Sequence, residues 1–214
     1  MKKTKKFFMT LLIIFGIGLV GYYFYINFFG EIKKIATPTE TAPIDHSNYS
    51  IEFVSSDEIY PDLTDKEVFS REKELSAIND GEMTLKIPAI SVDSPVLKGT
   101  TTRNLKKSVA CYDFSDAPGK GNRNLSIAGH RDIYGAEFYN IDKIGENDKM
   151  YVFYKDKVYV YSYVDTKICK SNDWSRLERT GQSLLTLTSC HPLHTSEKRI
   201  ITHAVLTEIW TEKN

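Results

Sequence analysis

The chain has 214 residues, with 28 Lys and Arg against 28 Asp and Glu, so its formal net charge is zero. This length accommodates one domain of ordinary size and a further segment, because single domains cluster at about 100 to 150 residues. The balanced charge excludes the basic surface of a typical nucleic-acid-binding protein, and three cysteines are too few for a disulfide framework.

The first thirty residues are typical of a signal anchor. Four lysines precede an uncharged stretch of 23 residues, Phe7 to Phe29. As a helix this stretch reaches about 34 Å and can cross a hydrocarbon core of about 30 Å, whereas a cleaved signal peptide has an apolar region of only about 7 to 15 residues. We therefore expect residues 1–30 to be a cytoplasmic basic end and a single transmembrane span, with the rest of the chain outside the cell. Processing near Ala36 is the alternative.

The next fifty residues, 31–80, indicate an extracellular stalk. They contain TPTETAPIDHSN and then mixed charges with weak periodicity, which favours a linker that lifts a folded domain from the membrane. A short helix is expected near Ser70 to Ile78. Without the four N-terminal lysines, 24 basic residues face 28 acidic ones, so the exported part has a net charge of about −4 and no nucleic-acid partner is expected.

From Met83 onwards the sequence alternates apolar and polar residues, as strands do. Pro88 and Pro95 suit strand edges or bulges. The clearest element is the hairpin KMYVFYKDKVYVYSYV, where two runs of β-branched and aromatic residues flank Lys155–Lys157. Its second run predicts tyrosines on one face of the strand and valines on the other.

A short helix and two strands complete the predicted elements. Asn172 or Asp173 is a suitable helix cap before WSRLERTG. Two strands then follow, Leu184–Cys190 and Arg199–Trp210. Many short strands with few helices predict an all-β domain over residues 81–214, either a sandwich or a closed barrel.

Three chemically active side chains are predicted at strand ends. If the last two strands pair antiparallel, Cys190 and Arg199 lie at the same end of adjacent strands. A strand from Asn124 to Ala128 delivers His130 to a similar position. A free thiol has a pKa of about 8.5, so it needs a neighbour such as imidazole to take its proton before it can attack. The arginine fork suits a carbonyl oxygen that becomes negative during acyl transfer.

Each residue also has a structural interpretation. Free cysteine is among the most buried residue types, so Cys190 alone would be read as a small core residue. Arg199 alone would be read as a surface partner of Glu197 or Glu208. Cys111 and Cys169 are interpreted as structural thiols. The coincidence of thiol, imidazole and guanidinium at strand ends favours a nucleophilic site.

Five segments then resemble, in order, the sortases, which are membrane-anchored cysteine transpeptidases of Gram-positive bacteria. The segments are MTLKIPAISVDSPVLKG, APGKGNRNLSIAGHRD, ENDKMYVFYKDKVYVYSYVDTKI, LLTLTSCHP and KRIITHAVL, within residues 83 to 209. The resemblance implies that Cys190 is the nucleophile, His130 the general acid and base, and Arg199 the residue that holds the oxyanion or orients the substrate. The family motif TLxTC has threonine where this chain has Ser189, and Ser108 stands where a glycine is common.

The resemblance implies a closed barrel of about eight strands with short helices and the active site at one end. It implies cleavage of a sorting signal similar to Leu-Pro-x-Thr-Gly between Thr and Gly, a thioester on Cys190, and transfer to an amine of a cell-wall precursor or of another protein. The expected partners are thus surface proteins with sorting signals. Pilus-assembling members carry a C-terminal hydrophobic segment, which this sequence lacks, so a class A-like or related N-terminally anchored class is expected.

Further site residues are expected around the nucleophile. Thr188, Ser189 and Ile201 are candidates for shaping the peptide site. No cofactor is expected, although Asp113 and Asp116, with Glu137 nearby, could bind calcium as in some sortases.

The sequence leaves three alternative interpretations. Cys190, His191 and His194 include zinc-binding residue types but lack a second Cys/His pair at ligand spacing. An L,D-transpeptidase would place histidine and glycine directly before the cysteine, and nothing similar precedes Cys190. An anchored β-barrel binding module would share the anchor and strands without needing a reactive thiol.

Overall fold

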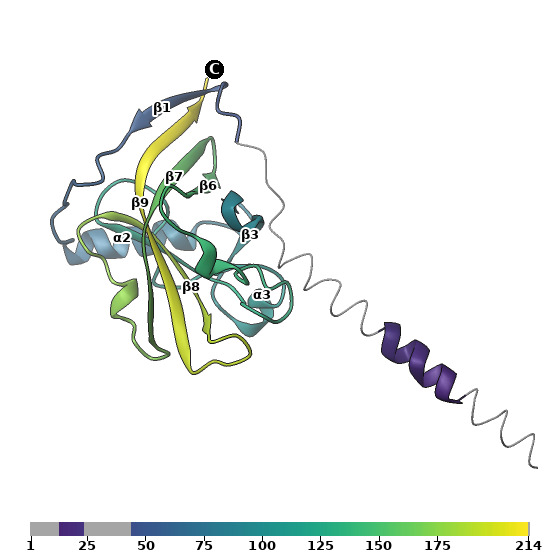
Figure 1. Ribbon diagram of the computed structural model, residues 1–214. Coiled ribbons are helices and arrows are strands. Elements are labelled where there is room, and N and C mark those ends of the chain that lie inside the picture. Colours follow the sequence, from purple (N-terminus) through teal and green to yellow (C-terminus); the bar gives the residue numbers. More distant parts are fainter. Residues whose placement is uncertain (1–12, 24–43, 214) are drawn as a thin grey trace, which may run out of the picture. The chain divides into compact units, whose positions relative to one another are not determined.

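The structure, a computed structural model, describes residues 13–23 and 44–213 (Figure 1). The chain divides into two compact units, Met1–Thr37 and Pro38–Asn214. In the first, residues 13–23 are helical. Among the described residues, no helix is both long and apolar enough to cross a membrane, and the predicted span at Phe7 to Phe29 lies partly outside them.

The second unit is a closed β-barrel of eight strands. Hydrogen-bonded neighbours follow the order β9-β7-β6-β2-β3-β4-β5-β8, and β8 pairs again with β9 to close the ring. The strands are β2 (Met83–Ile87), β3 (Val92–Lys98), β4 (Ala110–Cys111), β5 (Arg123–Ala128), β6 (Lys149–Tyr154), β7 (Lys157–Lys170), β8 (Ser183–His191) and β9 (Lys198–Glu212). The helical elements are short: α2 (Asp65–Ser76), α3 (Thr102–Leu105), η1 (Pro88–Ile90), η2 (Ile141–Lys143) and η3 (Ser175–Leu177). The predicted all-β barrel is confirmed.

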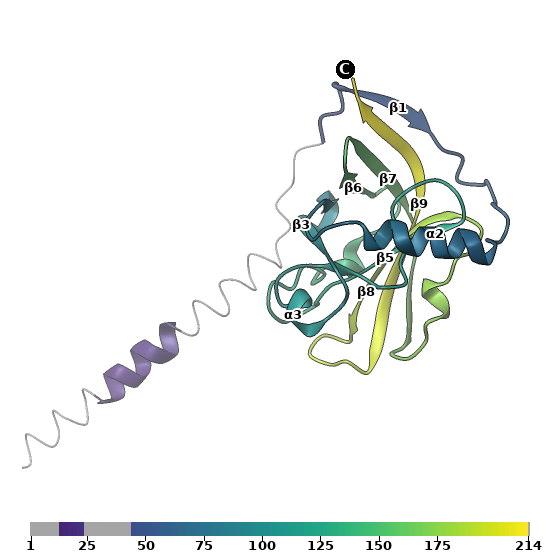
Figure 2. The ribbon, with the colours of Figure 1, turned by 180° about the vertical axis from the view of Figure 1, so that it is seen from behind.

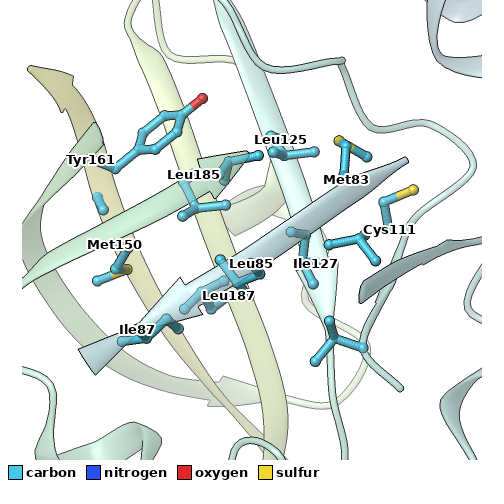
Figure 3. Close-up of a cluster of buried hydrophobic side chains, with 14 of the residues drawn as sticks. Met83, Leu85, Ile87, Cys111, Leu125, Ile127, Met150, Tyr161, Leu185 and Leu187 are labelled. Carbon is cyan, nitrogen blue, oxygen red and sulfur yellow. The ribbon is translucent and has the colours of Figure 1, made fainter. Parts of the chain in front are cut away.

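The interior of the barrel is filled by alternating apolar residues. On β2, Met83, Leu85 and Ile87 are buried and the residues between them are half-buried. They meet Leu185 and Leu187 of β8 in the cluster of Figure 3. Full burial of one such side chain contributes about 1.5 to 3 kcal/mol, so this cluster holds the strands in register.

The predicted hairpin is present as β6 and β7, joined by a turn at Lys155 and Asp156. Lys155 has a φ of 55°, the left-handed conformation that tight hairpin turns require. The two faces also separate as predicted: Tyr161 enters the main core, whereas Val158 and Val160 pack with Trp210 in a second cluster.

Residues 44–80 of the segment expected to be a stalk contribute to the folded unit. A strand, β1 (Tyr49–Phe53), pairs antiparallel with the last residues of β9. The helix α2 begins five residues before the predicted start, because Thr64 and Glu67 form a reciprocal capping box. Leu75 of α2 is 2% exposed within the main core. The helix shows weak periodicity because Leu75 is its one buried residue.

Polar contacts place α2 against the end of the barrel where β5 begins. Glu74 pairs with Arg123 at 3.0 Å, and Arg71 donates to the Asn122 carbonyl at 2.5 Å. Figure 2 shows α2 crossing the barrel near β5 and β8. This helix therefore lies at the opposite end of β5 from His130.

The helix expected after Asp173 is reduced to the single turn η3. The N-cap residue of this turn is Trp174 rather than Asn172 or Asp173. The Asp173 carboxylate, one residue earlier, accepts from the backbone N–H and hydroxyl of Ser175, at 3.2 and 2.6 Å. The carbonyls of Leu177 and Glu178 then accept hydrogen bonds from Asn124 on β5 rather than from a following helical turn. The competition of these tertiary bonds explains the short element.

Candidate active site

Strand register brings the three predicted residues together at one end of β5, β8 and β9. Cys190 on β8 is the direct partner of Arg199 on β9. On the other side, Ala128 of β5 is in register with Thr188, so His130, two residues further, stands level with Cys190. The Gly129 N–H bonds to the Thr188 carbonyl at 3.1 Å and extends the pairing past β5. Neighbouring strands are about 4.8 Å apart, so the three side chains share one rim.

Cys190 is a half-buried free thiol at the end of β8. Two residues earlier, the Thr188 hydroxyl bonds to that of Tyr112 at 2.8 Å. Burial raises the pKa of Tyr112, while Arg199 acts to lower it and Cys190 to raise it further. The phenol therefore lies within electrostatic range of both the thiol and the guanidinium.

His130 is positioned by the segment that follows β5. Its carbonyl accepts from the Phe138 N–H at 3.0 Å, and its ring packs on Tyr134 with centroids 5.1 Å apart. Gly129 is required here, because a Cβ would lie 2.7 Å from the Phe138 ring. The His130 Nε2 atom is buried and has no hydrogen-bond partner among the described residues. Burial lowers the pKa of His130, partly opposed by Asp132, so the ring favours the neutral form that accepts a proton.

Arg199 is held by the turn before β9. Its Nη1 atom donates to the carbonyls of Ser196 and Lys198, at 3.1 and 3.0 Å. Glu208, one of the two carboxylates that would pair with Arg199 at an ordinary surface position, bonds instead to Lys149 at 2.5 Å. Main-chain oxygens thus orient the guanidinium, and no carboxylate in the described part of the chain forms an ion pair with it.

Cys169, which is interpreted from sequence as a structural thiol, lies in one row across the strands with Arg199 and Cys190. On β7 it is the direct partner of Arg199, so it flanks the arginine on the side away from Cys190. Directly opposed residues in antiparallel strands point to one face. This placement follows from a register shift in β7 near Val164, which no local pattern in the sequence indicates.

An open cleft of about 340 Å³ is lined by residues of the β7–β8 loop and of the segment around β5, and none of the rim residues is among them. Its walls include Phe114 and Trp174, both about half exposed. Tyr112 connects the cleft to the rim, because it stacks on Phe114 at 5.1 Å, meets Trp174 edge-on at 6.0 Å and bonds to Thr188. Tyr112 therefore links the aromatic wall of the cleft to β8 two residues before Cys190.

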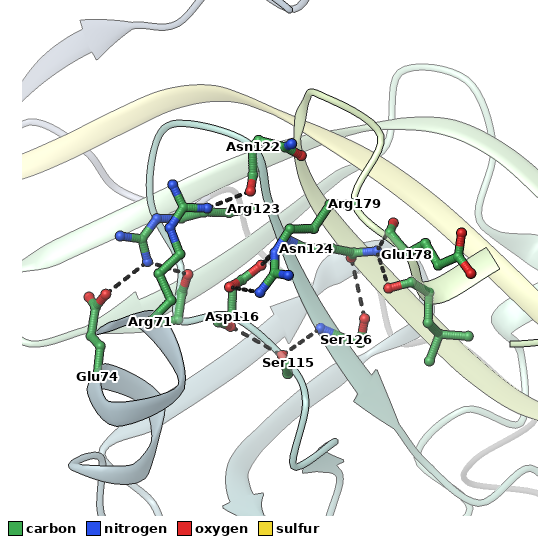
Figure 4. A network of polar contacts seen from close by, with 12 residues as sticks. Arg71, Glu74, Ser115, Asp116, Asn122, Arg123, Asn124, Ser126, Glu178 and Arg179 are labelled. Atoms are coloured by element: carbon green, nitrogen blue, oxygen red, sulfur yellow. Dashed lines mark hydrogen bonds and ion pairs between the residues drawn. The ribbon is translucent and has the colours of Figure 1, made fainter. Parts of the chain in front are cut away.

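One wall of the cleft is the β7–β8 loop, residues 171–182, which a polar network fixes to β5 (Figure 4). Arg179 donates to both oxygens of Asp116, at 2.8 and 2.7 Å. Asn124 Nδ2 donates to the carbonyls of Leu177 and Glu178, both at 3.0 Å. These hydrogen bonds hold the loop against the barrel.

The same network argues against calcium at the predicted acidic residues. Asp116 is buried, and its carboxylate is occupied by Arg179 and by the Asn124 N–H. Burial raises the pKa of Glu137, which disfavours the charged form that calcium binds. Asp113 is exposed. Among residues 13–23 and 44–213, no group of three or more His, Cys, Asp and Glu side chains could hold a metal ion.

The additional substrate-site candidates are all buried. Thr188 is 3% exposed and Ile201 is 1% exposed; they are direct partners on β8 and β9. The Ser189 hydroxyl donates to the Gly129 carbonyl at 2.8 Å. Ser189 therefore ties the residue before His130 to β8, a role that the hydroxyl of the more usual threonine would also serve.

The histidines of the zinc interpretation face other partners. His191 Nδ1 is 2.8 Å from Arg131 Nη1, and His194 Nδ1 is 3.1 Å from Asp132. A buried guanidinium beside His191 opposes a metal cation at that position.

Comparison with known proteins agrees with this geometry. A model of the sortase domain family matches residues 85–207, which is more than half of the chain. The chain belongs to the sortase family. It is 27% identical to sortase A of Bacillus anthracis over 205 residues, covering 94% of each chain. It is 33% identical to sortase SrtE2 of Streptomyces coelicolor over 148 residues, covering 60% of this chain and 56% of that protein.

Solved sortases share the fold. Sortase C-3 of Streptococcus pneumoniae superposes with a TM-score of 0.61 at 20% identity, covering 87% of this chain and 82% of that one. Membership of the family supports a cell-wall transpeptidase role, and thus an enzyme that acts on surface proteins bearing sorting signals.

Proposed function

We propose that this protein is a cysteine transpeptidase that cleaves an LPxTG-like sorting signal between Thr and Gly and transfers the acyl group to an amine. The observation that carries the proposal is the strand register that aligns Cys190 with Arg199 on one side and with His130 on the other. A nucleophile, a proton carrier and a fixed cation at one rim are the parts that acyl transfer needs.

The first half-reaction forms a thioester. His130, favoured in its neutral form, takes the thiol proton of Cys190, and the thiolate attacks the carbonyl carbon of the substrate threonine. Arg199 stabilises the oxygen that becomes negative. When the C–N bond breaks, the imidazolium of His130 returns its proton to the departing glycine nitrogen, and the threonine remains on sulfur.

The second half-reaction transfers the acyl group. An amine from a cell-wall precursor or from another protein attacks the thioester carbon, and His130 removes its proton. The Cys190 thiolate is the leaving group. No oxidant, reductant or metal ion is required by these steps.

The aromatic cleft, which Tyr112 connects to the rim, supports a peptide substrate. Phe114, Trp174 and Tyr112 provide aromatic surface for the apolar start of the sorting signal, and the signal's threonine would extend toward Cys190. We further propose that residues 1–30 anchor the enzyme in the membrane with the barrel outside the cell, where such substrates emerge.

The test uses the full chain with a panel of quenched sorting-signal peptides and with oligoglycine or diaminopimelate-type amines. Under this proposal, intact mass spectrometry detects a peptide adduct on Cys190, and added amine converts it to the ligated product. Cys190→Ala removes both signals, while Cys111→Ala, at a buried thiol outside the rim, serves as the matched control. Turnover without any adduct, or activity that survives Cys190→Ala, would refute the thioester.

A further inference from the structure

Residues 130–132 are matched one for one by residues of the segment that begins at Cys190. His130 stands level with Cys190, Arg131 bonds to His191, and Asp132 pairs with His194. Arg131 is 3% exposed, and its Nη2 atom also pairs with Asp142 at 2.9 Å. Two side-chain contacts therefore join Arg131 and Asp132, which follow His130, to His191 and His194, which follow Cys190.

The contact with Arg131 requires the Nδ1 atom of His191 to be unprotonated. A guanidinium offers only donors, so the Nδ1 atom of His191, 2.8 Å away, has to be an unprotonated acceptor. Protonation of that nitrogen removes the acceptor and places two cations in contact. Burial, Arg131 and Lys198 lower the pKa of His191, while Asp142 opposes them.

We propose that Arg131 is a positioning residue of the transpeptidase, which through neutral His191 sets the distance between His130 and Cys190. The inference rests on the proposed function, because the distance matters only if these two residues exchange a proton. Displacement of a catalytic group by about 1 Å can reduce the rate by about 10²-fold. The contact of Asp132 with His194 holds the same segment three residues beyond His191.

Protonation of His191 at low pH is expected to break its contact with Arg131. The charged groups that face His191 are Arg131 and Asp142 from the β5–β6 connection and Lys198 from β9. When His191 gains a proton, Arg131 keeps Asp142 and loses its hold on the chain after Cys190. The enzyme would then lose activity on acidification through His191 in addition to any loss through His130.

The first test compares substitutions at His191 in the full chain. His191→Asn keeps an acceptor near the position of Nδ1 but cannot be protonated, whereas His191→Leu removes the acceptor. We expect His191→Leu to lower kcat by about 10- to 100-fold with little change in KM, and His191→Asn to stay within about threefold of the parent while retaining more activity in acid. His46→Asn, at an exposed histidine of the β1 end, is the control. Equal defects in both His191 variants would overturn the proposal.

A second measurement is independent of turnover. In histidine-labelled full chain, NMR titration of Arg131→Gln should show the pKa of His191 rising toward its ordinary value and the His130 ring resonances moving. Unchanged His130 resonances would refute the positioning role even if no substrate were found. If the resonances move but no sorting-signal peptide is cleaved, the contact stands and the proposed function fails. Thermal unfolding of each variant identifies a loss that is due only to misfolding.

Discussion

Arg179 binds both carboxylate oxygens of Asp116 across a sequence separation of 63 residues. The carboxylate is buried, with its side chain 2% exposed, while the arginine is 26% exposed. One end of this ion pair is in the β7–β8 loop and the other lies just before β5. The pair therefore couples a wall of the cleft to the strand that leads to His130.

Arg179→Leu is expected to destabilise the fold by about 3 kcal/mol, because it leaves a buried carboxylate without its partner. The double variant with Asp116→Asn should recover part of this loss, since the remaining amide is uncharged. Urea unfolding of the single and double variants measures both values. A single variant as stable as the parent would show that the ion pair has no structural role.

Trp174→Ala is expected to raise KM for sorting-signal peptides about tenfold while leaving stability nearly unchanged. The ring is 55% exposed and contacts the aromatic side chains of Tyr112 and Phe114, so it offers surface to a ligand more than to the core. Trp174→Phe keeps an aromatic face and should restore most of the binding. Steady-state kinetics distinguish the cases, and an unchanged KM in the alanine variant would place the peptide elsewhere.

The acid limb of kcat/KM is expected to lie below pH 6.5, the ordinary value for histidine, because burial lowers the pKa of His130. Protonated His130 cannot take the thiol proton, so activity is lost as pH falls through that pKa. Asp132 acts in the opposite direction and raises it. Asp132→Asn keeps an acceptor for the His194 N–H but removes the charge, so the limb should move to lower pH. A limb that moves to higher pH in this variant would contradict the assignment.

Leu75→Ala is expected to cost about 2 to 4 kcal/mol, as truncation of a fully buried leucine does. Phe69 lies on the same helix but is 68% exposed, so Phe69→Ala should change stability by less than about 0.5 kcal/mol. Chemical denaturation compares the pair. If both variants changed stability by the same small amount, α2 would be a linker and not part of the core.

The features predictable from sequence are those that depend on local pattern. Alternation and turn residues indicated the β6–β7 hairpin, and the strand ends at Cys190, Arg199 and His130 were enough to infer one shared rim once antiparallel pairing was assumed. The parallel pairing of β5 with β8, which aligns His130, has no local signature. It was not predicted, because the family resemblance implied only that His130 belongs to the site.

The features missed depend on contacts between distant residues. In the sequence, Asp116 is not distinguishable from a solvated acidic residue, because its partner Arg179 is distant along the chain. Cys169 is the partner of Arg199 only because of the register shift in β7. A helix was expected near Ser70 to Ile78, but its start at Asp65 and its packing on the core were missed. Its capping box, Thr64 to Glu67, is legible in the sequence, but a single buried leucine gave too little periodicity to place the helix in the core.

The three rim residues are set by main-chain pairing, whereas the cleft wall is a loop fastened by side chains. Exchanges between residues 171 and 182 that keep Arg179 can therefore change the surface of the cleft while the pairing of the rim strands is kept. Under the proposed function, substrate choice and reactivity would then be separable, and this loop would be the place to graft a new preference.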